Sequence, residues 1–507
     1  MDSDAYLSRE EYERLEDARS ALKRLELELE WKPTPLWRLF REASCGGGEC
    51  RDIVEKHVLP KLNQTDVKFF YDVNTETRAL IKRSSRKREL EKDFRVCEMS
   101  SISALEFAWE NRLFWLRWMN EPHFCLRVAY TNKLELLKWA IEVKKCEWDS
   151  STISSAAHVG NLEMLKYCVA DQYFMELCMD SFPCLRAASN GHLECLKYLH
   201  EEVKAPWDSD TAAWAASYGH LHILEYLVER NYDHFYEETC WSAASNGHLD
   251  CLKYLHEVAK APWDSRTASE AALYGHLHIL EYLVEREFDK YDNYVCASAA
   301  ENGHLDCLKY LHEVAKADWD EDTANAAAEN GHLDILEYLV ERKYDEYDED
   351  ACWYAAKYGH LDCLKYLHEV AKAPWGSGTA KAAAENGHLH ILEYLVEQNY
   401  DQFNESACEY AAKYGHLDCL KYLHEVAKAP WSYRAVRWSY HSDCLKYLRE
   451  VARAPCDCKA VEFARERDRR ECLHYLLDNG CPLPEGWRYE RGELYTQQNP
   501  ELESDVA

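Results

Sequence analysis

The chain has 507 residues and a formal net charge of −31, with 91 Asp and Glu against 60 Lys and Arg. This balance disfavours nucleic acid, whose phosphates must be met by clustered basic residues, and an anionic membrane surface. No apolar run approaches the roughly 20 residues that cross a bilayer, and the acidic start Met1-Asp2-Ser3-Asp4 lacks the order of a signal peptide. A cytoplasmic protein is therefore expected, with the nucleus as the alternative.

Residues 1–30 predict one charged helix. Its heptad-like apolar stripe consists of Leu15, Ala18, Leu22, Leu25 and Leu29. The stripe is too short to define a coiled coil and suits packing against the rest of the chain. Residues 31–103 are expected to form a helical N-terminal region.

Within that region, residues 53–83 carry a recognisable pattern. It runs through Val58-Leu59-Pro60-Lys61-Leu62, then Asp66-Val67, Val73 and Arg78-Ala79-Leu80-Ile81. The pattern resembles the F-box, a short three-helix module that docks on the Skp1 adaptor of a cullin ubiquitin ligase, which implies a Skp1-type partner. The Leu-Pro that opens the first helix of that family is missing here. The alternative is an ordinary helical cap that shields the first repeat.

A tripeptide Gly-His-Leu then recurs at a constant 28-residue interval. Its glycines, expected to be structural, are Gly191, Gly219, Gly247, Gly275, Gly303, Gly331, Gly359, Gly387 and Gly415. A fixed period of this size is the signature of a solenoid, in which each repeat contacts only its neighbours. Such a stack offers a long surface without an obvious enclosed pocket, so binding is expected rather than catalysis.

Residues 239–258 show the plan of one repeat. Thr239 is the expected N-cap of a short first helix, and Gly247 supplies the left-handed residue that ends it. The apolar stripe of the second helix consists of Leu249, Leu252, Leu255 and Val258. Pro262 cannot continue that helix.

The pattern Thr-x-x-x-Ala-Ala-x-x-Gly-His-Leu-x-x-Leu-x-x-Leu resembles the ankyrin repeat. The resemblance implies antiparallel helix pairs stacked into a curved array with a concave recognition face. The period of that family is about 33 residues, so a 28-residue repeat must have lost residues from the connecting loop, and Ala212 stands where the family has Pro. We therefore expect shortened fingers without a β-hairpin and an all-α, ankyrin-type solenoid.

The solenoid is predicted to span residues 104–485 in about fourteen repeats, with a charge-rich last repeat at residues 459–480. Leu134 and Leu162 keep the phase upstream of the regular copies. Residues 486–507 are expected to form a disordered acidic tail. The chain is expected to be a monomer.

Two kinds of repeat alternate, so the full period is 56 residues. Lys and Glu take turns at one position of the second helix, and opposite charges are expected to face each other between stacked helices. That series begins with Lys197, Glu225 and Lys253. An aromatic residue also recurs in each loop, as in Trp207 and Phe235. We interpret it as loop packing, with a ligand-stacking strip as the alternative.

Most of the 22 cysteines recur at constant helical positions, as in Cys195 and Cys251. Residues placed in this way behave as small buried apolar groups in a reducing compartment. The pairs Cys45/Cys50 and Cys456/Cys458 lack the spacing of a zinc site. No metal and no cofactor are therefore expected.

Recognition is expected at positions that differ between copies, which lie in the first helix around the Ala-Ala pair. Ankyrin arrays, which this chain resembles, generally bind through this helix and the adjoining loop, and Trp and Tyr are enriched at interface hot spots. The leading partner contacts are Trp214, Tyr218, Trp241, Tyr274, Trp353 and Tyr354.

No catalytic set is recognised. The Gly-His-Leu histidines occur once per repeat, about a helix spacing apart, which is too far for one metal ion and favours a structural role. No phosphate-binding Gly-rich loop and no Ser/His/Asp set is found. The sequence predicts a non-catalytic scaffold that binds one or more proteins, and the alternative is an F-box-like substrate receptor of a cullin-RING ubiquitin ligase.

Overall fold

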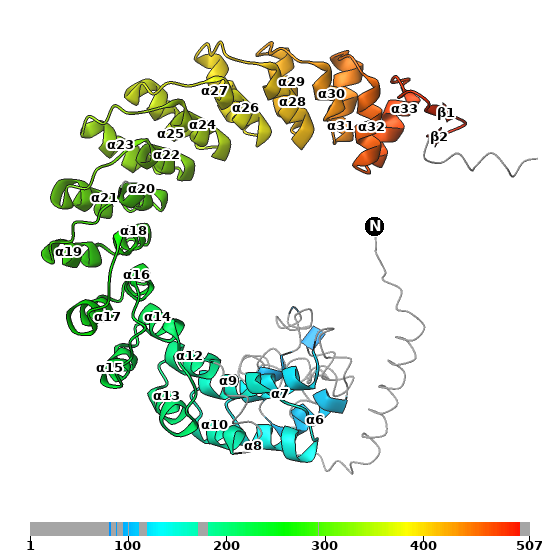
Figure 1. Ribbon diagram of the computed structural model, residues 1–507. Helices are drawn as coiled ribbons and strands as arrows, with labels where there is room; N and C mark the ends of the chain where they lie inside the picture. Colours follow the sequence, from blue (N-terminus) through cyan, green and yellow to red (C-terminus); the bar gives the residue numbers. More distant parts are fainter. Residues whose placement is uncertain are drawn as a thin grey trace, which may run out of the picture. The chain divides into compact units, whose positions relative to one another are not determined.

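The computed structural model describes residues 81, 82, 88, 95–99, 101–110, 119–170, 181–292 and 294–496. These residues form stacked pairs of antiparallel helices (Figure 1), which confirms the expected all-α, ankyrin-type solenoid. The chain divides into two compact parts, Met1–Phe235 and Tyr236–Ala507. The helix expected at residues 1–30 and nearly all of the F-box-like segment 53–83 lie outside the described residues.

In the N-terminal part, η4 (Val96–Glu98) and α6 (Ile102–Glu110) precede the helix pairs. The pairs are α7 (Glu121–Ala129) with α8 (Leu134–Lys138) and η6 (Trp139–Val143), α9 (Ser150–His158) with α10 (Leu162–Val169), α12 (Phe182–Ser189) with α13 (Leu193–Lys197) and η8 (Tyr198–Val203), and α14 (Ser209–Ser217) with α15 (Leu221–Glu229).

The C-terminal part continues the same alternation. Its pairs are α16 (Glu237–Ser245) with α17 (Leu249–Tyr254) and η9 (Leu255–Ala259), α18 (Ser265–Leu273) with α19 (Leu277–Glu285), α20 (Tyr294–Glu301) with α21 (Leu305–Tyr310) and η10 (Leu311–Ala315), α22 (Glu321–Asn330) with α23 (Leu333–Glu341), α24 (Glu349–Tyr358) with α25 (Leu361–Tyr366) and η11 (Leu367–Ala371), α26 (Ser377–Glu385) with α27 (Leu389–Glu397), α28 (Glu405–Tyr414) with α29 (Leu417–Glu425), α30 (Tyr433–Arg437) with α31 (Ser442–Lys446) and η12 (Tyr447–Val451), and α32 (Cys458–Glu466) with α33 (Arg470–Asp478).

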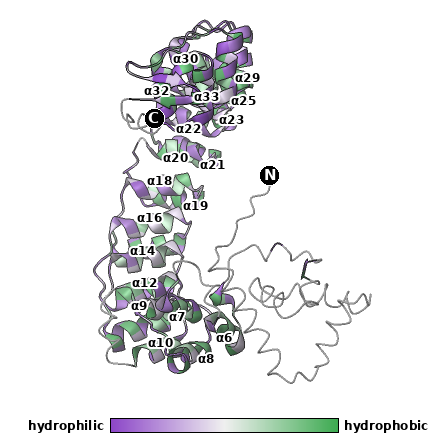
Figure 2. Cartoon of the chain, turned by 90° about the vertical axis from the view of Figure 1, so that its right-hand side faces the viewer, coloured by the Kyte–Doolittle hydropathy of each residue, from purple (hydrophilic) through white to green (hydrophobic). Residues whose placement is uncertain are grey.

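The first helices of neighbouring repeats pack directly against one another, as α18 does against α20 and α20 against α22. They approach closely because their central residues are small: Ala243 and Ala244 of α16 are fully buried. The second helices contribute the leucines of the core, such as Leu252 and Leu255. Figure 2 shows hydrophobic and hydrophilic residues on the same helices, as expected where each helix packs on one side only.

Thr239 is not the N-cap of its helix. The N-cap of α16 is Tyr236, and Thr239 lies three residues later, fully buried. In α14 the same arrangement forms a complete capping box, because Asp208 accepts from the backbone N–H of Thr211 and the Thr211 hydroxyl accepts from the backbone N–H of Asp208. The prediction placed the cap three residues too late because it assigned the capping role to the wrong member of this pair.

The second helices end in two different ways. We call a repeat Cys-type when its second helix carries Cys251 or an equivalent cysteine, and Ile-type when it carries Ile279 or an equivalent isoleucine. Most Cys-type helices finish in a π-helical turn, such as η9, whereas α19 of the Ile-type repeat stays α-helical to Glu285. The wider π turn changes the helical phase. Val258 is 54% exposed and does not continue the apolar stripe, and the equivalent Val426, which follows the purely α-helical α29, is 52% exposed as well.

The loops between described repeats contain no strand, in keeping with shortened fingers. The strands of the described residues lie instead at the C-terminal end, where β1 (Arg488–Glu490) pairs antiparallel with β2 (Glu493–Tyr495) and Tyr489 lies opposite Leu494. A disordered tail from residue 486 is therefore wrong for these residues. Gly492, with φ +87°, supplies the left-handed conformation that a tight turn between two strands requires.

The expected ladder of Lys–Glu ion pairs is also not observed among the described residues. Lys253 lies over the Tyr282 ring of the next repeat, with its ammonium 5.5 Å from the ring centroid. The ion pair that links these repeats joins Glu257 to Arg286 at 2.5 Å. Tyr282 donates a hydrogen bond to the same carboxylate at 3.2 Å. The aromatic ring takes the space in which Lys253 was expected to meet an acid.

Nearly all free cysteines of the described residues are buried, Cys97 and Cys458 being half-buried. Burial raises the pKa of Cys240 and Cys352 to about 12, so these thiols stay protonated and unreactive at neutral pH. One pair differs from the expectation of reduced cysteines: Cys456 forms a disulfide with Cys481.

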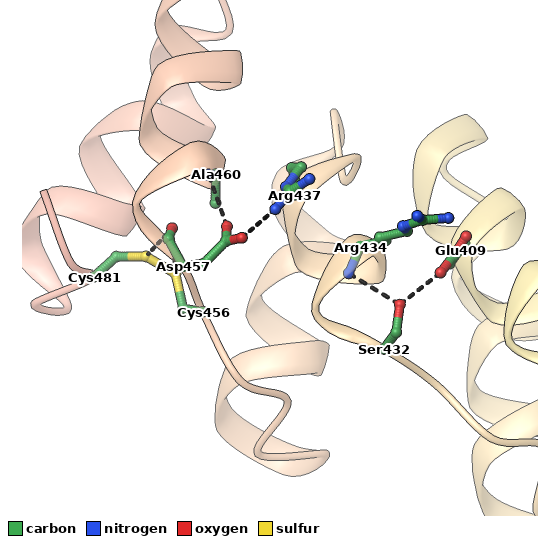
Figure 3. A network of polar contacts seen from close by, with 8 residues as sticks. All are labelled: Glu409, Ser432, Arg434, Arg437, Cys456, Asp457, Ala460 and Cys481. Carbon is green, nitrogen blue, oxygen red and sulfur yellow. Dashed lines mark hydrogen bonds and ion pairs between the residues drawn. A yellow bond between two sulfur atoms is a disulfide. The ribbon is translucent and has the colours of Figure 1, made fainter. Parts of the chain in front are cut away.

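This disulfide ties the loop before α32 to the segment after α33 (Figure 3). Asp457 caps α32 by accepting from the backbone N–H of Ala460 at 3.2 Å, and it also pairs with Arg437 of the preceding repeat. From the sequence, Cys456 had been paired only with its neighbour Cys458. Cys481 was not predicted as the partner because it lies one helix pair further along the chain.

Candidate partner-binding surface

The turn between the two helices is a structural site. Gly275 has a φ of +75°, and a Cβ placed there would lie 2.6 Å from the His304 ring of the next repeat. The histidine of this turn also contacts the preceding repeat: His276 Nε2 donates a hydrogen bond to the carbonyl of Ser245 at 3.1 Å. Burial holds the pKa of His276 below its ordinary value. The described residues contain no group of three or more metal-ligating side chains.

The loop aromatics form clusters within each pair of repeats. The His256 ring stacks on Trp263 with centroids 3.6 Å apart, and Trp263 meets Tyr282 and Phe288 edge-on. Phe288 in turn contacts Tyr291 at 5.1 Å. The faces and edges of these rings are therefore in contact with other rings of the same cluster.

The first helices carry a different set of aromatics, which point outward. On α12 and α14 of the N-terminal part, Phe182, Trp214 and Tyr218 line a cleft of about 580 Å³. Trp214 is 42% exposed and Tyr218 is 53% exposed, and their rings stack 5.7 Å apart. Two of the predicted partner contacts are therefore brought together in one place.

Charged groups border this cleft on both sides. Arg186 lies over the Phe182 ring, with its guanidinium carbon 4.9 Å from the centroid, and Asp210 lines the opposite helix. His158 accepts from the Asn190 side chain at 2.9 Å through its Nδ1. Burial, and secondarily Arg186, lowers the pKa of His158, so its ring is neutral at neutral pH.

A second pair of predicted contacts lies on α24 of the C-terminal part. Trp353 and Tyr354 meet edge-on at 4.9 Å, and both are half-buried. The Lys357 ammonium lies 4.8 Å from the centroids of Trp353 and Tyr358. A hydrogen bond with Tyr358 raises the pKa of Lys357.

The two other predicted contacts are placed separately. Trp241 on α16 is half-buried beneath Arg266, whose guanidinium carbon is 3.9 Å from the ring centroid. Tyr274, at the C-terminal end of α18, is 52% exposed.

Other outward-facing residues were missed as leading contacts. Phe182 lies in the first turn of its helix, outside the positions that were compared between copies. Its column holds mostly polar residues such as Asp210 and Glu238, and Tyr294 is its other aromatic residue, so an aromatic side chain at this position was a usable signal. Tyr410 and Tyr414 on α28, with Lys381 4.2 Å from the Tyr410 centroid, extend the aromatic surface beyond α24.

The family model described as "Ankyrin repeats (3 copies)" matches residues 153–238, 212–294, 296–375 and 370–430, which together cover more than half of the chain. The chain belongs to the ankyrin-repeat family. Its array is thus a repeat scaffold of a kind that suggests protein interaction. No curated protein matches the chain.

Solved structures with a similar course of the chain include the pentatricopeptide repeat protein PPR10 from maize. That structure shares 12% identity with a TM-score of 0.28, and covers 92% of this chain and 86% of its own. PPR10 in complex with an 18-nt psaJ RNA element shares 12% identity with a TM-score of 0.27, over 94% of this chain and 86% of that one. Among the described residues of the ankyrin array, none of the helices has the length and apolar character needed to cross a membrane.

Proposed function

We propose that the chain is a non-catalytic scaffold that binds a segment of a partner protein along its first helices. The observation that carries the proposal is the cleft at which Phe182, Trp214 and Tyr218 all expose their rings. Neighbouring exposed aromatics are typical of interaction surfaces, and Trp and Tyr are the usual anchors of such surfaces. The loop aromatics do not serve this purpose, because they already pack on one another.

Arg186 and Asp210 supply one positive and one negative group at the same cleft. A partner segment with an apolar anchor and polar groups on both sides of it would match this arrangement. We further propose that the chain binds neither nucleic acid nor an anionic membrane, because its net charge is −31. A monomer in the cytoplasm or the nucleus is part of the same proposal.

The test is affinity capture with the full chain, followed by quantitative mass spectrometry. The variant Trp214→Ala/Tyr218→Ala should lose specific partners by about ten-fold or more, because anchors of this kind contribute about 2 kcal/mol or more each. The control is Val314→Ala/Val370→Ala, which trims two exposed valines of η10 and η11. Equal capture by the two variants, with circular dichroism unchanged, would remove the proposed surface.

The F-box-like pattern at residues 53–83 supports a second proposal, recruitment of a Skp1-type adaptor with the array as substrate receptor. Purified adaptor should be retained by the full chain, and the change Leu59→Glu/Leu62→Glu should abolish retention because charged groups disrupt an apolar docking helix. Leu25→Glu, in the separate segment 1–30, is the control. Failure of the unaltered chain to retain the adaptor rules this role out.

A further inference from the structure

Two repeats carry a tryptophan at the same position of the first helix, Trp241 in α16 and Trp353 in α24, two 56-residue periods apart. In the first copy the chain itself supplies a cation to this ring. Arg266 of α18 lies 3.9 Å above Trp241, and its Nε donates to Glu270 at 3.0 Å. The residue equivalent to Arg266 in the second copy is Gly378.

The second copy has an open cleft at this place. Its volume is about 190 Å³, and it is lined by Glu349, Asp350, Trp353, Tyr354, Gly376, Gly378 and Thr379. We call it the Trp353 cleft. A Cβ added to Gly378 would lie 3.0 Å from Trp353 Cδ1. Gly376 and Gly378 therefore contribute no side chain to the wall that α26 and its N-cap form.

The polar groups of the Trp353 cleft favour a cation. Glu349 and Asp350 both line it, in the first turn of α24. Thr379 is fully buried, and its hydroxyl has no hydrogen-bond partner, as is also true of the equivalent Thr267 and Thr323. The acid that precedes this threonine in other copies, such as Asp264, is replaced by Gly376 here, which leaves Glu349 and Asp350 as the charged groups of the cleft.

The size and shape of the cleft suit a planar cation better than a bare ion. The cleft, with a volume of about 190 Å³ beside an aromatic ring, has room for a guanidinium group. Aromatic rings and carboxylates are the two partners that guanidinium prefers. Lys357 lies over Trp353 from the same helix but does not line the cleft, so it leaves this space open.

We propose that the Trp353 cleft binds an arginine side chain of a partner protein, in the manner in which Trp241 holds Arg266. This inference rests on the proposed function and names the chemistry of one partner contact. The chain contains its own reference for this contact, because the filled and the open copy share one fold. In the open copy Gly376, Gly378 and Ala382 replace Asp264, Arg266 and Glu270.

The test uses the full chain with 5-fluorotryptophan and ¹⁹F NMR. The probes are acetyl-Gly-Arg-Gly-amide and its citrulline and lysine counterparts, and the signals are assigned with Trp353→Phe and Trp241→Phe. The Arg probe should shift the Trp353 signal in a saturable way. Citrulline, which has the same shape without charge, should bind about ten-fold more weakly, because it loses both the cation–π and the carboxylate interactions.

Two reciprocal variants sharpen the test. Gly378→Arg restores the internal cation and should abolish the response of Trp353, whereas Arg266→Gly should open a second site and make the Trp241 signal respond to the Arg probe. The Arg266→Gly result stands on its own where Gly378→Arg folds poorly. Glu349→Gln/Asp350→Asn should weaken the Arg probe and leave citrulline unchanged.

Equal binding of the Arg and citrulline probes, or no response of Trp353, would overturn the inference. A Trp353 shift that depends on protein concentration without any probe would also overturn it, because a second copy would then fill the cleft. None of these three results bears on the proposed function, which is tested separately by partner capture through Trp214 and Tyr218. Loss of partner capture in the Trp214→Ala/Tyr218→Ala variant together with a silent Trp353 would therefore refute the arginine site alone.

Discussion

The Cys-type and Ile-type repeats share one fold but differ in how their second helices end. In a Cys-type repeat the π turn η9 brings His256 face to face with Trp263, at 3.6 Å and 11°. At α29, which lacks a π turn, the equivalent His424 and Trp431 lie 4.1 Å apart and tilted by 34°. The parallel stack therefore accompanies the π turn, and His424 is instead hydrogen-bonded to the Tyr447 hydroxyl at 2.8 Å.

The following Ile-type repeat completes the same cluster. Phe288, after the end of α19, meets Trp263 edge-on, while Arg286 and Tyr282 both reach back to Glu257. The alternation of sequence is thus an alternation of structure. A Cys-type repeat and the Ile-type repeat after it share one aromatic cluster. An ion pair also joins them at Arg230, Arg286 and Arg342, whereas Gln398 replaces the arginine after α27. The 56-residue period is the length of that assembly.

The largest effect is expected from Phe288→Ala, which removes a buried ring from the shared cluster. Loss of a buried Phe costs about 3 kcal/mol or more. Hydrogen exchange followed by mass spectrometry should show faster local opening in both η9 and α19. Val258→Ala, at an exposed position of η9, should change opening by less than about 0.5 kcal/mol. Faster exchange in α19 alone would mean that the two repeats are not one assembly.

The next effect concerns the turn that both types of repeat share. Gly275→Ala places a Cβ at a positive φ and against the His304 ring, so it should destabilise the chain by about 2 kcal/mol or more. Gly480→Ala meets the same backbone strain, but no atom lies within 4 Å of the added Cβ. It should cost about 1 kcal/mol. If hydrogen exchange shows that both variants lose the same local stability, the contact with the ring contributes nothing.

A smaller effect is expected from pH, through the stacked histidines of the Cys-type repeats. Burial, and then Lys260, holds the pKa of His256 below its ordinary value of 6.5, and burial acts likewise on His200, His312 and His368. A lowered pKa in the folded state means that unfolded chains take up more protons in acid. The stability from these rings is therefore complete above pH 6.5 and is lost as the pH falls through their folded-state values.

The melting temperature should consequently fall by a few degrees, about 2–4 °C, between pH 7 and pH 5.5. Replacing the four stacked histidines by Gln should flatten this dependence, while His474→Gln, at an exposed position of α33, should leave it intact. An unchanged slope in the fourfold variant would mean that other groups cause the acid sensitivity.

Sequence periodicity was sufficient for the fold, because Gly-His-Leu and the leucine stripe repeat without interruption. It failed at the ends of the second helices. No residue of Leu-His-Glu-Val-Ala predicts a π turn. Val258 was assigned to the apolar stripe although a residue nine positions after Leu249 lies on the opposite side of an α-helix. The disulfide partner Cys481 and the hairpin at Tyr489 were also not predicted. Both lie beyond the end of the repeat pattern, where only tertiary contacts determine the structure.

The surface was harder to predict than the fold. Variation between copies pointed to Trp353 and Trp241 alike, and it could not distinguish a ring covered by Arg266 from one beside a cleft. The difference comes from the next repeat, where Gly376 and Gly378 replace Asp264 and Arg266. Comparing each candidate with the residue that faces it one repeat later would have separated the two.

The smallest effect is expected from the ion pair that joins the two types of repeat. Hydrogen bonding to Arg286 lowers the pKa of Glu257, yet both groups are reached by solvent. Exposed pairs are screened by salt. Arg286→Gln should therefore lower the melting temperature by no more than about 1 °C at low salt and by less at high salt. The double change with Glu257→Gln isolates the coupling, and a salt-independent loss would assign the effect to the contact of Arg286 with the Tyr282 ring instead.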